Sequence, residues 1–238
     1  MGRRARIILA TLGATALVGA ITCALRPSPY SDVPSIKETP AYQDSALLER
    51  AWALPAAAAY GERVDFQENG SVCGPTSVVN ILRSLGQPTT IDAVLEDTGY
   101  CWTGYCIPGL TLDELAEIAR AQGVDEVTLH RDLSFDEFQE HLRASNDPEL
   151  RYIINFHRGP LFAGGGGHHS PIGGYLEEQD LVLVLDVNEG YKPWIVAADR
   201  LFAAMDTVDG GSGEKRGLLR FRGAPPEMPE AAAGSDPR

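Results

Sequence analysis

The sequence predicts a single α+β domain, with helices in its first half and a largely antiparallel sheet in its second half. Apolar residues recur at helical spacing, with capping signals, between residues 45 and 143. After Pro148 the pattern changes to short apolar runs separated by turns, as strands require. A chain of 238 residues, 44% of them hydrophobic, can bury one substantial core. Helices followed by strands are typical of α+β folds.

Five helices are expected in the first half, and three of them have clear end signals. An amphipathic run that follows Cys73 ends at Gly86. Thr111 and Ser134 each begin a capping box with a glutamate three residues later, which satisfies free N–H groups at a helix start. Gly123 ends the helix that Thr111 begins. The expected helices cover 45–57, 75–85, 91–97, 111–122 and 134–143.

Four strands and one short helix are expected in the second half. The strands cover 151–157, 170–176, 181–187 and 217–221, and the helix covers 198–205. The last residues, 223–238, are polar and rich in proline and alanine, so we expect a disordered tail. The folded domain then spans 45–222.

The first 25 residues resemble a targeting segment. Three arginines among the first six residues precede an apolar run at 7–25. The pattern is typical either of a cleavable secretory signal or of an uncleaved single-span anchor, and Cys23 lacks a good lipobox before it. We therefore expect an exported, periplasmic protein, tethered to the inner membrane if the segment is retained. A linker rich in proline and serine is expected at 26–44.

The charge of the chain limits the classes of partner. The formal net charge is −13, which argues against nucleic acid and against an anionic membrane surface. Contact with a membrane is expected only through the N-terminal segment. An anionic small substrate would need arginines placed close to the site.

The remaining cysteines divide into a pair and a single thiol. Cys101 and Cys106 are close enough in sequence to form a small-loop disulfide in an oxidising compartment. A soft-metal or redox pair is the alternative, but two cysteines without nearby histidine are a weak zinc signature, and we predict no metal site. Cys73 is then unpaired, and an unpaired thiol in an exported protein is a candidate nucleophile.

The surroundings of Cys73 favour the nucleophile. A helix start offers free N–H groups and the positive end of the helix dipole, which lower the pKa of a thiol. His168 opens a predicted strand, and Asp186 ends a neighbouring strand where a carboxylate needs a partner. Such a set can act as nucleophile, base and orienting group. Gln67, six residues before Cys73, can donate to an oxyanion hole.

The register of the hairpin decides whether His168 can meet Asp186. With a three-residue loop at 177–179, His168 faces Asn188 and is a diagonal neighbour of Asp186 on one face of the sheet. A four-residue loop without a bulge would put the two on opposite faces. We expect the first arrangement. His169 then points the other way, as a polar residue at the rim.

With these residues assembled, the chain resembles the phytochelatin synthase family, which has a papain-like cysteine peptidase fold. The stretches that carry the resemblance are "QENGSVCGPTS", "FHRGPLFAGGGGHHSPIGGY", "LVLVLDV" and "AAMDTVDGGSGEKRGLL", in this order and spacing. The resemblance covers about 53 to 221. The resemblance implies that Cys73, His168 and Asp186 form a triad and that Gln67 is the oxyanion donor.

The resemblance also implies the substrate. Family members act on glutathione: the thiol attacks the Cys–Gly bond, glycine leaves, and a γ-glutamylcysteinyl thioester remains. Water then releases γ-glutamylcysteine, or a second glutathione accepts the group and yields phytochelatin. Arg158 and Arg216 match arginines that hold substrate carboxylate in the family, with help from Asn155. Hydrolysis needs no cofactor, whereas Cd or Zn ions are expected as activators or as the metal–glutathione substrate.

Departures from the family pattern favour hydrolysis over transfer. A short polar tail stands where plant members carry a long cysteine-rich region, and the segment 188–193 is shorter than in the family and acidic. One alternative is an exported papain-like peptidase of the double-glycine type. The other is a non-catalytic thiol or metal-binding protein that uses Cys73 and "CWTGYC". Both a monomer and a homodimer are compatible with the sequence.

Overall fold

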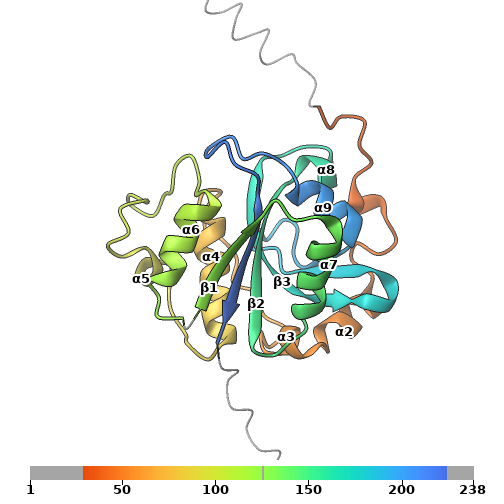
Figure 1. Ribbon diagram of the computed structural model, residues 1–238, viewed down its shortest axis with the longest axis horizontal. Helices are drawn as coiled ribbons and strands as arrows, with labels where there is room; N and C mark the ends of the chain where they lie inside the picture. The colour runs from red at the N-terminus through yellow and green to blue at the C-terminus, as the bar shows by residue number, and fades with distance from the viewer. Residues whose placement is uncertain (1–28, 125, 224–238) are drawn as a thin grey trace, which may run out of the picture.

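A six-stranded antiparallel sheet forms the centre of the molecule and has helices on both faces (Figure 1). The computed structural model describes residues 29–124 and 126–223. The strands are β1 (Glu126–Arg131), β2 (Leu150–His157), β3 (Gly167–Leu176), β4 (Leu181–Val184), β5 (Trp194–Ala197) and β6 (Gly217–Arg222), in the spatial order β1-β6-β2-β3-β4-β5. The α+β class predicted from the sequence is confirmed.

Helices divide between the two faces of the sheet. The helices are α2 (Ser45–Trp52), α3 (Pro55–Ala58), α4 (Cys73–Ser84), α5 (Ile91–Leu95), α6 (Leu112–Arg120), α7 (Phe135–Ala144), α8 (Gly159–Phe162) and α9 (Ala198–Met205), with short 3-10 helices at Ile36–Glu38 and Glu177–Gln179. In Figure 1, α4, α5 and α6 lie on one side of the sheet, and α7, α8 and α9 lie on the other. The alternation of side chains along each strand supplies one apolar cluster to each helical layer.

Local signals place the helices where the sequence predicts them. Thr111 and Ser134 both form complete capping boxes, at the starts of α6 and α7. Gly86, which follows the C-cap Leu85 of α4, has a positive φ of 75°, and its N–H donates to Arg83 O, so a residue with free φ ends the helix there. Helix α4 begins at Cys73 itself, two residues earlier than expected.

Two strands and one packed segment were missed by the sequence analysis. The strands β1 and β5 lie at the two edges of the sheet and are short, with six and four residues. The prediction of a linker at 26–44 is wrong for the part that the structure describes. Ile36 is only 1% exposed within one of the two apolar clusters, and Ile195 N donates to Tyr42 O. Burial of apolar side chains therefore fixes this segment to the domain.

The predicted targeting segment and most of the predicted tail lie outside the described residues. Within 29–124 and 126–223, no helix has the length and apolarity needed to cross a membrane.

The β3–β4 hairpin has a β-bulge that sets the positions of the site residues. Near the turn Leu176 pairs with Leu181, so the loop has four residues and the predicted three-residue loop is wrong. The register shifts between Ile172 and Gly174, so that Ile172 pairs with Val184. Beyond the bulge the register is therefore the predicted one. A four-residue loop alone would put His168 and Asp186 on opposite faces of the sheet. The extra residue, Gly173, returns both side chains to one face.

We expect Gly173→Ala to destabilise the domain by about 1–3 kcal/mol. A methyl group there would lie 2.7 Å from Leu183 Cδ2 and 3.0 Å from Leu185 Cδ2, inside a closely packed core. Thermal unfolding measures the effect. Gly164→Ala is the matched control, because nothing lies within 4 Å of the added atom and the backbone is not left-handed. Equal melting temperatures for the two variants would show that the bulge tolerates a side chain.

Candidate active site

Cys73 is the first residue of α4 and lies beside the start of β3. The N-cap residue Val72 makes no side-chain cap, so N–H groups of the first turn stay free at the thiol. Ser77 Oγ donates to Cys73 O at 2.8 Å and to His169 O at 3.2 Å, which ties the first turn of the helix to the strand. Cys73 is a free cysteine and is 8% exposed.

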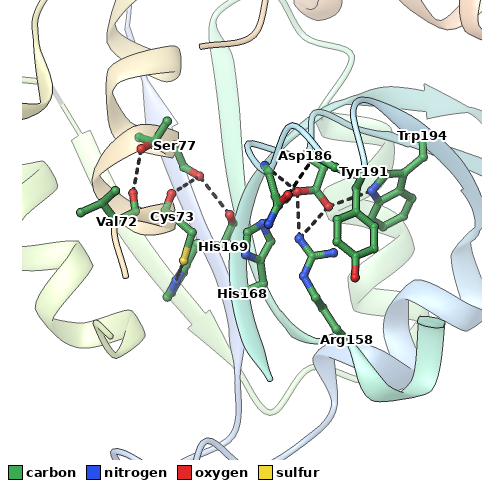
Figure 2. A network of polar contacts seen from close by, with 12 residues as sticks. Val72, Cys73, Ser77, Arg158, His168, His169, Asp186, Tyr191 and Trp194 are labelled. Carbon is green, nitrogen blue, oxygen red and sulfur yellow. Dashed lines mark hydrogen bonds and ion pairs between the residues drawn. The ribbon is translucent and has the colours of Figure 1, made fainter. Parts of the chain in front are cut away.

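His168 and Asp186 meet on the face of the sheet that also carries Trp194. His168 Nε2 lies 3.0 Å from Asp186 Oδ1, and Trp194 Nε1 donates to Asp186 Oδ2 at 2.9 Å. The backbone N–H of Asn188 donates to Oδ1 at 2.9 Å. Figure 2 shows the carboxylate between the His168 and Trp194 rings. Asp186 is fully buried, and these donors keep it ionised there.

Charge in the site favours a thiolate–imidazolium pair. Burial alone would raise the pKa of Cys73, but His168 and then His169 lower that pKa well below its ordinary value. Burial would lower the pKa of His168, but Cys73 and Asp186 together raise it above its usual range. The pKa of Asp186 lies far below that of a free aspartate despite burial, because His168 and Arg158 are adjacent. The structure thus brings Cys73, His168 and Asp186 together.

His169 is not where the sequence analysis puts it. The prediction is a polar residue at the rim, on the face opposite to His168, but His169 is 3% exposed, and its Nδ1 lies 3.8 Å from Cys73 Sγ. It does point to the opposite face from His168. That face carries α4, whose first residue is Cys73, so His169 lies at the thiol and adds to the effect of His168 on its pKa.

Arg158 occupies a different place from the predicted substrate arginine. Its Nη2 donates to both oxygens of Asp186 at 2.9 Å, and its guanidinium lies 3.8 Å from the centre of the Tyr191 ring (Figure 2). It is 6% exposed and is not among the residues that line the cavity at Cys73. We therefore correct its role: Arg158 positions the carboxylate that orients His168.

Arg216 and Asn155 both line the cavity beside Cys73. Arg216 Nη2 lies 3.3 Å from Asp209 Oδ2, and its Nε is buried without a hydrogen-bond partner. Asn155 Nδ2 lies 2.6 Å from His169 Nε2, while its Oδ1 is buried without a partner. Asn155 thus contacts the second histidine as well as the space where a substrate would bind.

Gln67 is attached to the segment that carries Asp186. Its backbone N–H donates at 2.8 Å to the carbonyl oxygen of Val187, the residue directly after Asp186. Its side-chain Oε1 is buried without a hydrogen-bond partner. No hydrogen bond within the described residues uses its Nε2, and Gln67 is not among the residues that line the cavity at Cys73.

The cavity has a volume of about 280 Å³ and lies between the first turn of α4, the start of β3 and two loops. One loop contributes Pro108 and Gly109, and the other contributes Asp209 and two glycines. The first loop contains the Cys101–Cys106 disulfide, as the sequence predicted. It is joined to the segment before Cys73, because Cys106 N donates to Ser71 Oγ at 3.0 Å. The loop that forms one wall of the cavity is thus closed by a disulfide and joined by a hydrogen bond to the segment before Cys73.

Two observations in the described part of the chain bear on metal binding. Residues 29–124 and 126–223 hold no cluster of three or more histidine, cysteine, aspartate or glutamate side chains placed to bind one ion. The sulfurs of Cys101 and Cys106 are bonded to each other, so the soft-metal alternative lacks its thiolates in this state.

Two residues of the site escaped the sequence analysis. Asp209 stands in the glycine-rich "DGGSG" loop, where a turn aspartate is unremarkable in sequence. His169 is predicted at the rim because its strand position opposes that of His168. The signal that could have found it is Asn155, which is its cross-strand partner and a polar residue within an otherwise apolar stretch of strand.

The chain is similar in sequence to a known family and to several known proteins. A family model described as phytochelatin synthase matches residues 38–218. Glutathione gamma-glutamylcysteinyltransferase 3 of Lotus japonicus is 35% identical over 116 residues, which are 48% of this chain and 24% of that protein. Glutathione gamma-glutamylcysteinyltransferase 1 of Triticum aestivum is 27% identical over 205 residues, or 70% of this chain and 40% of that protein. The chain spans less than half the length of these relatives.

Solved structures support the fold. A protein described as a C39-like peptidase from Bacillus anthracis superimposes with a TM-score of 0.50 and 12% identity. The match covers 70% of this chain and 96% of that one. At this identity the likeness concerns the fold alone, and it agrees with a papain-like arrangement of a cysteine at a helix start against an antiparallel sheet.

Proposed function

Because the chain belongs to the phytochelatin synthase family, we propose that it cleaves the Cys–Gly bond of glutathione through a thioester on Cys73. The observation that carries this proposal is a free thiol with a lowered pKa, which opens on a cavity lined by one arginine and one aspartate. A thiolate is the nucleophile that acyl transfer needs, and an amino-acid-like substrate end needs both charges.

The geometry supports the following acylation step. Cys73 Sγ attacks the carbonyl carbon of the scissile bond, and the imidazolium of His168 gives its proton to the departing glycine nitrogen. The Asp186 carboxylate, fixed by its hydrogen bonds, keeps the imidazole oriented and stabilises its charge. Free N–H groups at the start of α4, together with Gln67 Nε2, can stabilise the oxyanion.

The charges of the cavity suit the γ-glutamyl end of glutathione. That end is a free α-amino acid, with one carboxylate and one ammonium group. Arg216 has a buried Nε without a partner that can bind the carboxylate, and the neighbouring Asp209 carboxylate can bind the ammonium. Both residues line the cavity beside Cys73. A peptidase for double-glycine sites would have no use for this pair.

Water is the acceptor that we favour for the thioester. The segment that follows Asp186 is short and carries Glu189, which is unfavourable for a second anionic glutathione. The product is then γ-glutamylcysteine, and phytochelatin would be a minor product. A Cd²⁺ or Zn²⁺ ion would enter as part of a metal–glutathione substrate.

The proposal is tested with the purified full chain and glutathione, with and without Cd²⁺, and with thiol products identified by mass. We expect glycine and γ-glutamylcysteine, and neither product with Cys73→Ala. A double-glycine peptide in a parallel reaction should remain intact. Intact glutathione in every condition would refute the substrate assignment, and cleavage of the peptide would favour the peptidase function instead.

Arg216→Lys should raise KM for glutathione by about 10- to 100-fold, the effect of losing a charge-assisted hydrogen bond, with a smaller change in kcat. Lysine keeps the positive charge but cannot present the Nε donor of arginine. Steady-state kinetics separates the two constants. Arg220→Lys is the control, because this arginine lies in β6, which begins directly after Arg216, pairs with Glu126 and does not line the cavity. Equal KM values for the two variants would contradict a role in binding.

A further inference from the structure

Two imidazoles lower the pKa of the Cys73 thiol, and the acylation step uses only one of them. His168 and His169 are successive residues of β3, so their side chains leave opposite faces of the strand. His168 pairs across the sheet with Phe156, and His169 pairs with Asn155. The His169 ring reaches the sulfur because β3 begins beside the first turn of α4, where Ser77 Oγ donates to His169 O.

The two rings differ in their partners. His168 Nε2 lies on the Asp186 carboxylate, which favours its charged form. His169 Nε2 lies 2.6 Å from the Asn155 amide, which is neutral. A neutral amide stabilises a neutral imidazole of one tautomer and gives little support to an imidazolium. His168 is thus suited to hold a proton beside the thiolate, and His169 is suited to receive one.

The cavity distinguishes the rings further. Cys73, Asn155 and His169 line it, whereas His168 and Asp186 do not. An acceptor that enters through the cavity therefore approaches the thioester carbonyl on the side of His169. A general base must lie within hydrogen-bond reach of the proton that it removes, and His169 Nδ1 is 3.8 Å from the sulfur that carries the acyl group.

We propose that His169 is a second catalytic residue, which takes the proton of the acceptor during cleavage of the Cys73 thioester, and that Asn155 positions it. This inference rests on the proposed function for the identity of the acyl group, but not for the chemistry on Cys73.

Atoms and charges balance in the proposed step. The oxygen of a water molecule forms a bond to the thioester carbonyl carbon while one of its protons moves to His169 Nδ1. The C–S bond then breaks, and its electron pair stays on Sγ as the thiolate. The acid product loses its own proton to solvent. The protonated ring of His169 then balances the charge of the thiolate. Its proton finally passes to His168, which gave up a proton to glycine during acylation.

Asn155 can stabilise either tautomer of the His169 ring because its amide offers both a donor and an acceptor. Its Oδ1 is buried without a partner, next to the ring that Nδ2 contacts. Rotation of the amide places Oδ1 on Nε2–H, and the tautomer with a bare Nδ1 is then the stable one. With Nδ2 on Nε2, the ring proton is on Nδ1 and can be donated to the thiolate. The amide is therefore a positioning group for the ring and its tautomer.

The test separates acylation from deacylation on Cys73. p-Nitrophenyl acetate acetylates the thiol of the full chain without any need for glutathione recognition, and intact mass follows the loss of the acetyl group. We expect His169→Gln to slow deacetylation by about 100-fold or more, while acetylation stays within about tenfold of the parent. His168→Gln, the matched control, should mainly slow acetylation at neutral pH. Asn155→Ala should slow deacetylation and flatten its pH dependence.

Three outcomes would overturn the inference. The first is deacetylation at the parent rate in His169→Gln. The second is an equal slowing of acetylation and deacetylation. The third is a slowing of deacetylation that a lower melting temperature of the variant explains. His169→Phe provides a second, non-titrating variant if the glutamine variant folds poorly. If glutathione is not a substrate but deacetylation depends on His169, the proposed function fails and the inference stands. If both His169 variants turn over glutathione with unchanged kinetics, the inference fails and the proposed function stands.

Discussion

Asp186→Ala is expected to abolish turnover and to destabilise the fold by about 3–5 kcal/mol, the effect of removing one partner from a buried ion pair. Asp186 is fully buried, and its removal leaves Arg158, which is 6% exposed, without its anionic partner. Turnover should fall about a thousandfold or more, because His168 loses the group that orients it. Denaturant unfolding and steady-state kinetics measure the two effects.

Two comparisons make this prediction specific. The double variant Asp186→Ala/Arg158→Met should recover most of the stability but none of the turnover, since the unpaired buried charge is gone while His168 stays without a partner. Glu177→Ala removes a partner of exposed Arg143 and should change the unfolding free energy by less than about 1 kcal/mol. A stable Asp186→Ala variant would show that Arg158 is not held by this carboxylate in solution.

Asp186 also predicts a dependence of stability on pH. Its pKa is lower in the folded state than in the unfolded state, so its contribution is fully present above the ordinary aspartate pKa. The contribution is lost as the pH falls from that value towards the folded pKa. Acid should therefore narrow the difference in unfolding free energy between the parent and the Asp186→Ala variant.

The second large effect concerns the reactivity of Cys73 as a function of pH. Because its pKa is lowered well below the ordinary value, the thiolate forms at a pH where a free cysteine is still protonated. Iodoacetamide should thus alkylate the parent protein at neutral pH and below. His168→Gln should move the midpoint of alkylation to higher pH, because burial, which raises the pKa, then meets less opposition.

Turnover and alkylation should separate at alkaline pH. The imidazolium of His168 is needed to protonate the leaving glycine, and its raised pKa keeps it charged at neutral pH. As the pH rises through that pKa, turnover should fall while alkylation stays fast, because the thiolate remains. Ser77→Ala is the control for general damage, since this residue binds Cys73 only through the backbone oxygen. Parallel pH profiles for turnover and alkylation would contradict an ion pair between the Cys73 thiolate and the His168 imidazolium.

Most of the fold was predictable because its helices carry local signals. The capping boxes at Thr111 and Ser134 and the glycine after α4 act within a few residues, so sequence alone reveals them. The edge strands β1 and β5 depend instead on pairing with partners that no nearby residue specifies. Glu126 pairs with Arg222, a contact that no local pattern announces.

The proximity of His168 to Asp186 was predictable, whereas the contacts of His169, Asn155 and Arg158 were not, for one physical reason. Cys73, His168 and Asp186 are each marked by their place at the end of an element. His169 and Asn155 are defined by which face of the sheet α4 covers, and Arg158 by which face Asp186 occupies. The bulge at Gly173 determines which face of the sheet Asp186 occupies, because a single inserted residue reverses the face of every side chain beyond it. The residues close to a position in sequence therefore do not show which face of the sheet its side chain occupies.

The most direct test of the account is to trap the acyl-enzyme. The full chain is mixed with glutathione, quenched in acid within the first turnover, digested and analysed by peptide mass spectrometry. We predict that the peptide that contains Cys73 carries a γ-glutamylcysteinyl group, which hydroxylamine removes, and that glycine is released in equal amount. An unmodified Cys73 together with intact glutathione, or glycine release that survives Cys73→Ala, would contradict the central claim.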